Sequence, residues 1–283
     1  MNKLLAVLFG STLSIGLNAQ VTLGPTVATF GVLAGSTVTN SGPTTVIGNL
    51  GVSPGTAITG FTGIAPGGPG MVFGSIDSAD PVALQAQNEL TTAYNAAAGA
   101  ASTAVKSGDL GGQTLFPGVY TISTSIGITG VVTLDAQNNP NAQFIFQIGS
   151  TLTTATSSVV NLINGAQPSN VFWQVGSSAT LGTTSSFSGN ILALSSISAG
   201  TGASILGRLL ARNGAVTLLS NSIIKPNGNG GPGGGPGGGP GGGPGGGPGA
   251  TPIPSSLILV TMALFCGGIY QTRERLLKLI RRS

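Results

Sequence analysis

The side chains that could carry out chemistry are few and scattered. The chain of 283 residues has six carboxylates, one cysteine at Cys266 and no histidine. Without histidine, neither a Ser-His-Asp triad nor a Cys-His pair can form. A zinc site is also excluded, because it needs clusters of imidazole, thiolate or carboxylate ligands. We therefore predict no catalytic residue, no metal and no cofactor.

Paired carboxylates could still hydrolyse glycosides, so the position of each acid matters. Asp77 and Asp80 stand before a helical segment, where capping and the helix dipole favour an acid. Asp109 precedes Leu-Gly-Gly, and Asp135 precedes an Asn-Asn-Pro turn. We interpret all four as turn and cap residues, and we predict that the protein is not an enzyme.

Charge is sparse and unevenly placed. Charged residues make up 6% of the chain, against about 25% in typical soluble proteins. Residues 20–250 hold four basic and five acidic side chains, whereas residues 273–282 hold five basic and one acidic. A nearly neutral body excludes nucleic-acid binding, which needs a basic surface. Arg208 and Arg212 are expected at a solvated edge or in a salt bridge.

Residues 1–19 predict a secretory signal peptide. Lys3 is followed by an apolar run, and the small Ala19 stands before Gln20 at the expected cleavage point. A buried first helix is the alternative. Residues 226–250 repeat Gly-Gly-Gly-Pro, and this period of four excludes collagen, which needs glycine at every third position. We predict a flexible linker there.

Residues 251–283 predict a C-terminal anchor. A Pro252-Ile253-Pro254 motif, an apolar stretch over 257–270 and a basic end follow one another. The stretch is short for a span, which takes about 17–25 residues, and the basic end would stay cytoplasmic. The order resembles C-terminal sorting signals of the PEP-CTERM type, with Ile253 in place of Glu; a plain membrane anchor explains it equally. Either way, we expect a secreted body outside the cytoplasmic membrane, tethered to the cell surface.

One helix is predicted over residues 81–98. Asp80 is a good N-cap and Pro81 a good first residue, and Gly99 supplies a stop. A packing face is expected at helical spacing. Its residues are Val82, Ala86, Leu90, Ala93 and Ala97.

The remaining body consists of short β-segments organised by an internal repeat. Residues 30–39, 144–153 and 171–180 share alternating apolar residues, a Gly-Ser corner and a small polar–apolar–Thr strand, and residues 189–193 recur as 207–211. Coils of this length predict a β-solenoid with rungs about 4.7–4.9 Å apart. An immunoglobulin-like sandwich competes, but it does not explain the rung-to-rung repeat.

The repeat predicts which side chains face outward, because they alternate along a strand. Val38, Leu152, Ala179, Ile197 and Val216 are expected to point inward. The predicted outward face consists of Thr37, Thr39, Ser125, Thr151, Thr153, Ser178, Thr180, Ser196, Ser198, Ala215 and Thr217. This uncharged hydroxyl grid could match a crystalline surface such as ice. Thr and Ser also favour strands in general, and the pattern alone leaves both explanations open.

Six segments in order carry a resemblance to a known family. They are residues 30–40, 48–55, 110–121, 134–154, 170–183 and 207–224. The chain resembles the microbial ice-binding proteins of the DUF3494 type. The resemblance implies a mainly β fold over residues 20–225: a discontinuous, right-handed, three-faced β-solenoid with one long α-helix packed alongside.

The resemblance also implies a function. The protein would adsorb to ice through the flat face, without a cofactor, and inhibit ice growth and recrystallisation or attach the cell to ice. The expected partners are the ice surface and, through the C-terminal segment, the membrane; the body is expected to be monomeric. A cell-surface adhesin or structural module that binds carbohydrate or protein is the alternative. It is less favoured because Trp173, the single tryptophan, is expected to be partly buried.

Overall fold

The computed structural model describes residues 20–63 and 67–228, which form a parallel β-solenoid. The predicted signal peptide, the anchor and all but the first residues of the linker lie outside the described residues. Within the described ranges, no helix is long and apolar enough to cross a membrane. Every strand pair in these ranges is parallel. The solenoid prediction is therefore confirmed, and the sandwich alternative is wrong.

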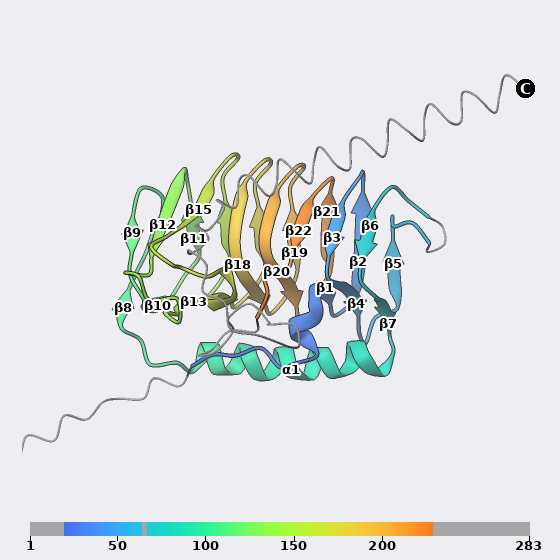
Figure 1. Cartoon of the computed structure of the whole chain (residues 1–283), viewed down its shortest axis with the longest axis horizontal. Helices are drawn as coiled ribbons and strands as arrows, with labels where there is room; N and C mark the ends of the chain where they lie inside the picture. The colour runs from blue at the N-terminus through green and yellow to red at the C-terminus, as the bar shows by residue number, and fades with distance from the viewer. Residues whose placement is uncertain (1–19, 64–66, 229–283) are drawn as a thin grey trace, which may run out of the picture. The chain divides into compact units, whose positions relative to one another are not determined.

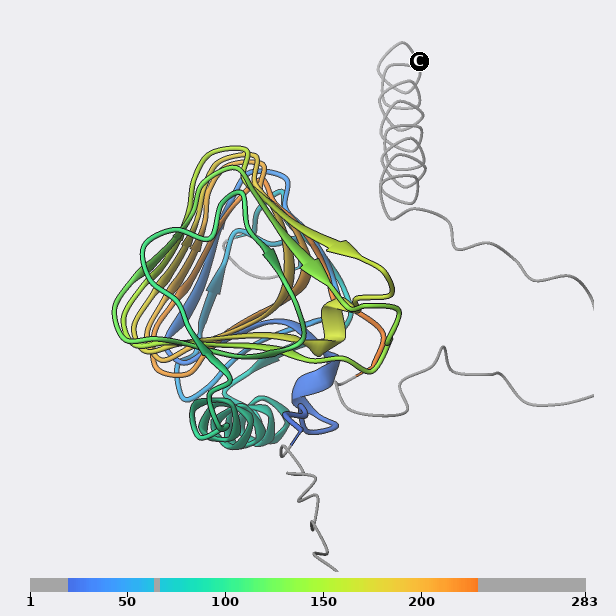
Figure 2. The ribbon, with the colours of Figure 1, turned by 90° about the vertical axis from the view of Figure 1, so that its left-hand side faces the viewer.

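Each rung passes through three faces, so the cross-section is a triangle (Figure 2). The first is the helix-covered face. Its strands, in spatial order, are β8 (Ala104–Val105), β10 (Gly118–Ile122), β13 (Phe144–Ile148), β16 (Val171–Val175), β18 (Ser186–Ala193), β20 (Ser204–Ala211), β1 (Phe30–Ala34), β4 (Asn49–Val52) and β7 (Ile76–Ser78).

The second face is a separate sheet of seven strands in the described part of the chain. Their order is β11 (Ile126–Ile128), β14 (Leu152–Thr154), β17 (Ala179–Leu181), β19 (Ile197–Ala199), β21 (Val216–Leu219), β2 (Thr37–Ser41) and β5 (Ala57–Thr59). The third face is formed by the first halves of β18 and β20 together with six short strands. These are β9 (Thr114–Leu115), β12 (Val131–Asp135), β15 (Val159–Ile163), β22 (Ser222–Ile224), β3 (Thr45–Ile47) and β6 (Met71–Phe73).

The chain does not build its rungs in sequence order. The rungs of β1 to β7 stack onto the last rung, where β2 pairs with β21 and β3 pairs with β22. The helix α1 (Pro81–Ala98) then runs the length of the stack, and the chain begins again at the far end with β8 (Figure 1). The solenoid is therefore discontinuous, as expected.

The helix begins and ends where the sequence predicts. The Asp80 carboxylate accepts a hydrogen bond from the Ala83 N–H at 2.8 Å. At the other end, the Gln147 side-chain amide donates to the carbonyls of Ala97 and Ala100 at 2.9 and 2.7 Å. The predicted packing face is correct except at Val82, which is 44% exposed. Ala83 is buried in its place, because it lies on the same side as Ala86 and Leu90.

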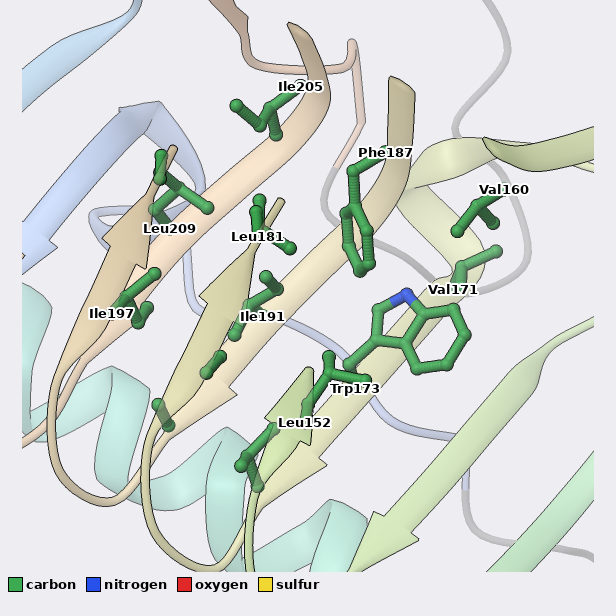
Figure 3. Packing of buried hydrophobic residues seen from close by; sticks show 14 of the residues in the cluster. Leu152, Val160, Val171, Trp173, Leu181, Phe187, Ile191, Ile197, Ile205 and Leu209 are labelled. Atoms are coloured by element: carbon green, nitrogen blue, oxygen red, sulfur yellow. The ribbon is translucent and has the colours of Figure 1, made fainter. Parts of the chain in front are cut away.

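The interior is apolar and stacked in register with the rungs. The Trp173 ring is fully buried and lies 3.9 Å from the Phe146 ring, centroid to centroid, with an angle of 7° between the planes. Phe187 packs against its other side at 5.3 Å (Figure 3). The indole N–H donates to the Ser188 carbonyl at 3.1 Å, so burial leaves no unsatisfied donor.

The repeat in the sequence is the register of the rungs. Residues 186–193 pair with 204–211 one to one, so that Gly189 lies beside Gly207. A Cβ on Gly207 would collide with the Gly189 carbonyl oxygen. Two rungs turn a tight corner at this place, and only glycine lets their backbones approach.

Candidate functional site

The second face presents the predicted hydroxyl groups to solvent. We call its outer surface the hydroxyl face. The side chains beneath it, Val38, Leu152, Ala179, Ile197 and Val216, are all at most 1% exposed. Because side chains alternate along a strand, the six predicted residues inside these strands point outward, and the other five, which directly precede the strands, are linked to one another along the edge of the same face. The structure thus brings them together, and their contact with ice stays a prediction.

The outward residues form two rows that cross the rungs. The central row is fixed by the strand register. It consists of Gly127, Thr153, Thr180, Ser198, Thr217, Thr39 and Thr59. The corner row lies two residues earlier in the chain, at the first residue of β2 and β5 and directly before the other five strands. It consists of Ser125, Thr151, Ser178, Ser196, Ala215, Thr37 and Ala57.

The two rows use their hydroxyl groups differently. In the corner row, the hydroxyl oxygens of Ser178 and Ser196 accept from the backbone N–H groups of Ser196 and Ala215 at 3.3 and 3.1 Å. Thr151 donates to the Ser125 hydroxyl at 2.8 Å. Part of the hydrogen-bonding capacity of these hydroxyl groups is therefore used within the protein.

The hydroxyls of the central row form no hydrogen bond to any described residue. Thr39, Thr153 and Thr180 are exposed, and the other hydroxyl residues of the row are half-exposed. Each of them therefore has its full donor and acceptor capacity available to water.

The spacing of the central row is regular. Neighbouring rungs are about 4.8 Å apart, and the two rows are separated by about 6.6–6.8 Å along each strand. Buried side chains lie below the strands, and every strand of this sheet except the edge strands β11 and β5 is paired on both sides, so the grid is rigid. A charged side chain, which would hold its own hydration shell, is found in neither row.

Asp109 closes one end of the hydroxyl face. Its backbone bridges Gly127 of the edge strand β11, and its carboxylate accepts from the Thr129 N–H and hydroxyl at 3.0 and 2.8 Å. Burial by itself would raise the pKa of Asp109, but the hydrogen bonds from Thr129 and Gly111 lower it below the usual value. The turn explanation of this residue is confirmed, and the cap also blocks pairing at the sheet edge.

Ala57 and Thr59 in β5 extend the two rows by one rung, and the sequence analysis missed them. The cause is the Ser53-Pro54-Gly55 corner, which breaks the repeat pattern before β5. The signal was nevertheless present, since Ala57-Ile58-Thr59 repeats the small–apolar–Thr pattern of the other rungs.

The remaining polar residues do not form a reactive centre. In the described ranges, no three of His, Cys, Asp and Glu lie close enough to hold a metal ion. Asp77 is not a helix cap as expected: it lies in β7, is buried and accepts from the Ser75 hydroxyl at 2.7 Å. Asp135 accepts from the Gln137 N–H at 2.8 Å, in the turn predicted for it.

The prediction of a solvated edge or a salt bridge was wrong for Arg208. Arg208 is 1% exposed and donates to neutral oxygens only, including the Asn190 side chain at 2.9 Å. Arg212 lies over the Tyr94 ring, with its guanidinium carbon 4.8 Å from the ring centroid. Both guanidinium groups therefore contact uncharged groups of the protein.

The fold and site together define a class: a discontinuous β-solenoid with a lengthwise helix and one flat, uncharged hydroxyl face. The sequence model described as "Ice-binding-like" matches residues 32–224. The chain therefore belongs to the Ice-binding-like family.

Individual relatives agree with this assignment. An ice-binding protein of Nostoc sp. (strain HG1) is 52% identical over 207 residues, covering 72% of this chain and 74% of the relative. One of Colwellia sp is 38% identical and covers 70% of this chain and 81% of its own length. The crystal structure of an ice-binding protein from Antarctomyces psychrotrophicus matches with a TM-score of 0.69 at 41% identity, covering 73% of this chain and 99% of that one.

Proposed function

We propose that the protein binds ice by non-covalent adsorption through the hydroxyl face, and so inhibits ice growth and recrystallisation. The observation that carries this proposal is the central row, in which six of the seven residues present a free, uncharged hydroxyl group on a rigid grid. Family membership and the ice-binding relatives support it independently. Adsorption of this kind needs no cofactor and has no turnover, and an exported, monomeric body suits it.

The chemistry of the grid explains the preference for ice over liquid water. Each Thr offers one hydroxyl that can donate and accept, next to one methyl group. Because the side chains are held in place before contact, ordering them costs little free energy on adsorption. The free energies of many weak contacts with ice then add up, because the contacts repeat at a fixed spacing. Liquid water is not ordered at this spacing and can form only a few of these contacts at once.

Thermal hysteresis and ice recrystallisation inhibition of the purified protein test the proposal. We expect activity in the parent and its loss when Thr153 and Thr180 are both replaced by Tyr, because the bulky rings lift the ice surface from the grid. Thr133→Tyr is the matched control: Thr133 points outward on the third face, between the buried Val132 and Leu134. It should retain activity.

The outcomes separate the alternatives. If the double Tyr variant folds and remains active, ice contact lies elsewhere on the molecule. A folded parent without activity contradicts the proposal altogether.

The two rows should also contribute unequally. Thr180→Ala removes a free hydroxyl, whereas Ser178→Ala removes one that partly serves the Ser196 N–H. We therefore propose that activity falls more for Thr180→Ala than for Ser178→Ala. Equal losses, or a larger loss at Ser178, would show that the corner row makes the main contact.

A carbohydrate-binding adhesin is not favoured. Saccharide sites commonly use exposed aromatic rings, and Trp173 is wholly buried. A hollow of about 430 Å³ near β8 is lined by Gln20, Thr103, Asn139, Asn141 and Gln143, among others, and contains no aromatic side chain.

We further propose that the chain acts on the outside of the cell membrane, tethered through its C-terminal segment. The supporting features are the predicted signal peptide, the linker and the sorting-type end of the sequence. Cell fractionation tests this: we expect the protein at the cell surface, and removal of residues 251–283 should release it into the medium.

A further inference from the structure

Arg208 is a buried cation that contacts no carboxylate within residues 20–63 and 67–228. Its Nε and Nη2 groups donate to the Ala28 carbonyl at 3.2 and 2.8 Å, and Nη2 also donates to the carbonyls of Pro226 and Gly228 at 3.1 and 2.9 Å. Burying a cation is costly unless its hydrogen bonds are satisfied. We call Arg208 with the carbonyls of Ala28, Pro226 and Gly228 the exit clamp.

The exit clamp is rooted in the rungs of the solenoid. Arg208 Nη1 donates to the Asn190 side-chain oxygen at 2.9 Å. The Asn190 amide nitrogen in turn donates to the carbonyls of Pro168, Ser169 and Val171 at 3.1–3.2 Å. The last described residues of the chain are thus connected to two rungs and to the N-terminal segment at once.

The clamp lies at the corner opposite the hydroxyl face. Each rung passes along the helix-covered face, then the hydroxyl face and then the third face. Arg208 stands where β20 turns from the third face into the helix-covered face. In a triangle this corner is opposite the hydroxyl face, and Figure 2 shows the orange end of the described chain there.

The strand β22, which comes directly before the end of the described chain, is oriented so that it resists a pull on that end. β22 pairs with β20 on one side and with β3 on the other, so it is an inner strand. The third face runs from the edge of the hydroxyl face toward the exit corner (Figure 2). A pull on the chain end, away from the hydroxyl face, therefore acts largely along β22. Its ladder hydrogen bonds must then break together rather than one by one.

We propose a further function, which rests on the proposed ice binding: the domain carries tension between ice on its hydroxyl face and a surface that holds the chain beyond Gly228. The exit clamp keeps that tension in line with β22. Without the clamp, residues 225–228 would detach from the corner. The force would then act at the end of β22 and break its ladder hydrogen bonds one after another. The second partner, besides ice, is the surface to which the chain beyond Gly228 is attached.

Single-molecule pulling on the full chain tests this function without any ice. One handle is attached at Thr180→Cys on the hydroxyl face, in a Cys266→Ser background, and the other at the C-terminus. We expect Arg208→Lys to lower the force of the first unfolding step, because a single ammonium group cannot reach all the carbonyls. Arg212→Lys, four residues away and not in contact with the chain end, is the control and should leave the force unchanged.

Thermal hysteresis, measured with Arg208→Lys in the otherwise unmodified chain, should remain that of the parent, since Arg208 is remote from the hydroxyl face. An unchanged unfolding force in folded Arg208→Lys would overturn the force-carrying function. A parent without thermal hysteresis would instead overturn ice binding, and the two failures are therefore distinct.

A second comparison needs no substitution at Arg208. The parent is pulled between Thr180→Cys and either its C-terminus or its N-terminus. Residues 20–29 precede β1 and belong to no strand of their own, and side-chain hydrogen bonds such as those between Val21 and Gln143 hold them, so the N-terminal attachment should yield at the lower force. A C-terminal attachment that yields at the same or a lower force contradicts the proposal.

Discussion

Threonine is suited to the central row because its side chain is both polar and apolar. On the hydroxyl face it can contribute a free hydroxyl without adding charge. The chain uses the same residue type for capping and packing elsewhere, as when Thr129 binds Asp109. The difference therefore comes from position in the fold: on the central row the hydroxyls form no hydrogen bond to the part of the chain that the structure describes.

Glu89 gives a residue-scale prediction about pH. Burial alone would raise its pKa, but hydrogen bonds from the Val27 N–H, the Gln85 side chain and Thr26 lower it in sum. A carboxyl whose pKa is lowered by folding stabilises the fold above its unfolded pKa, and this stabilisation is lost as the pH falls through the folded value.

Glu89→Gln should therefore destabilise the protein at neutral pH by about 1 kcal/mol, a value kept low because the group is partly exposed. The difference from the parent should shrink between pH 7 and pH 3, as protonation brings the Glu89 carboxyl toward the neutral state of the glutamine side chain. Urea unfolding at the two pH values measures it. A deficit of equal size at both would assign the effect to packing.

Residue positions were predictable where a local pattern decides them. Alternation predicted eleven outward residues around the apolar positions Val38, Leu152, Ala179, Ile197 and Val216, and these five side chains are buried; the ice contact of the eleven stays a prediction. The environment of Arg208 was not predictable, since its acceptors are backbone carbonyls from Ala28 and from the chain end, which no sequence pattern brings together. Val82 was misplaced because its apolar character outweighed the helical phase, which favours Ala83.

At the scale of elements, the rung is the repeating unit, and Trp173 is its largest interior side chain. We expect Trp173→Ala to destabilise the protein by about 3–5 kcal/mol, since it leaves a cavity and separates Phe146 from Phe187. Thermal unfolding measures the loss. Phe116→Ala, which removes a ring that is 47% exposed, is the control and should cost much less. Similar losses would mean that the aromatic stack adds little.

Elements were predicted best where they repeat or carry caps. The helix bounds followed from Asp80, Pro81 and Gly99, and the neighbouring strands β18 and β20 followed from the repeat of residues 189–193 at 207–211. The pairing of β2 with β21 could not be read from the residues themselves, because it joins the first and last parts of the body. The family resemblance implied a discontinuous solenoid but not this pairing, and β5 was missed.

At the scale of the whole molecule, the hydroxyl face is separated from the titrating groups. No described residue of either row titrates, and Asp109, at the end of the face, already has a lowered pKa. We therefore expect thermal hysteresis to be constant between about pH 5 and 9, as the neutral hydroxyls do not change. A loss of activity within this range, while circular dichroism shows an unchanged fold, would point to ice contact by charged groups outside the two rows.

The discontinuous stacking has a consequence for the order of events during synthesis. The rungs of β1 to β7 leave the ribosome first, yet their neighbours in the stack, β20 to β22, are made last. The early rungs cannot form these pairs until the last rung has been made. The pairs join residues that are far apart in the sequence, and such a topology slows folding. A nascent chain therefore has no complete solenoid until residue 224 has emerged. The strand pairs that complete the solenoid can form only when its final rung has been made.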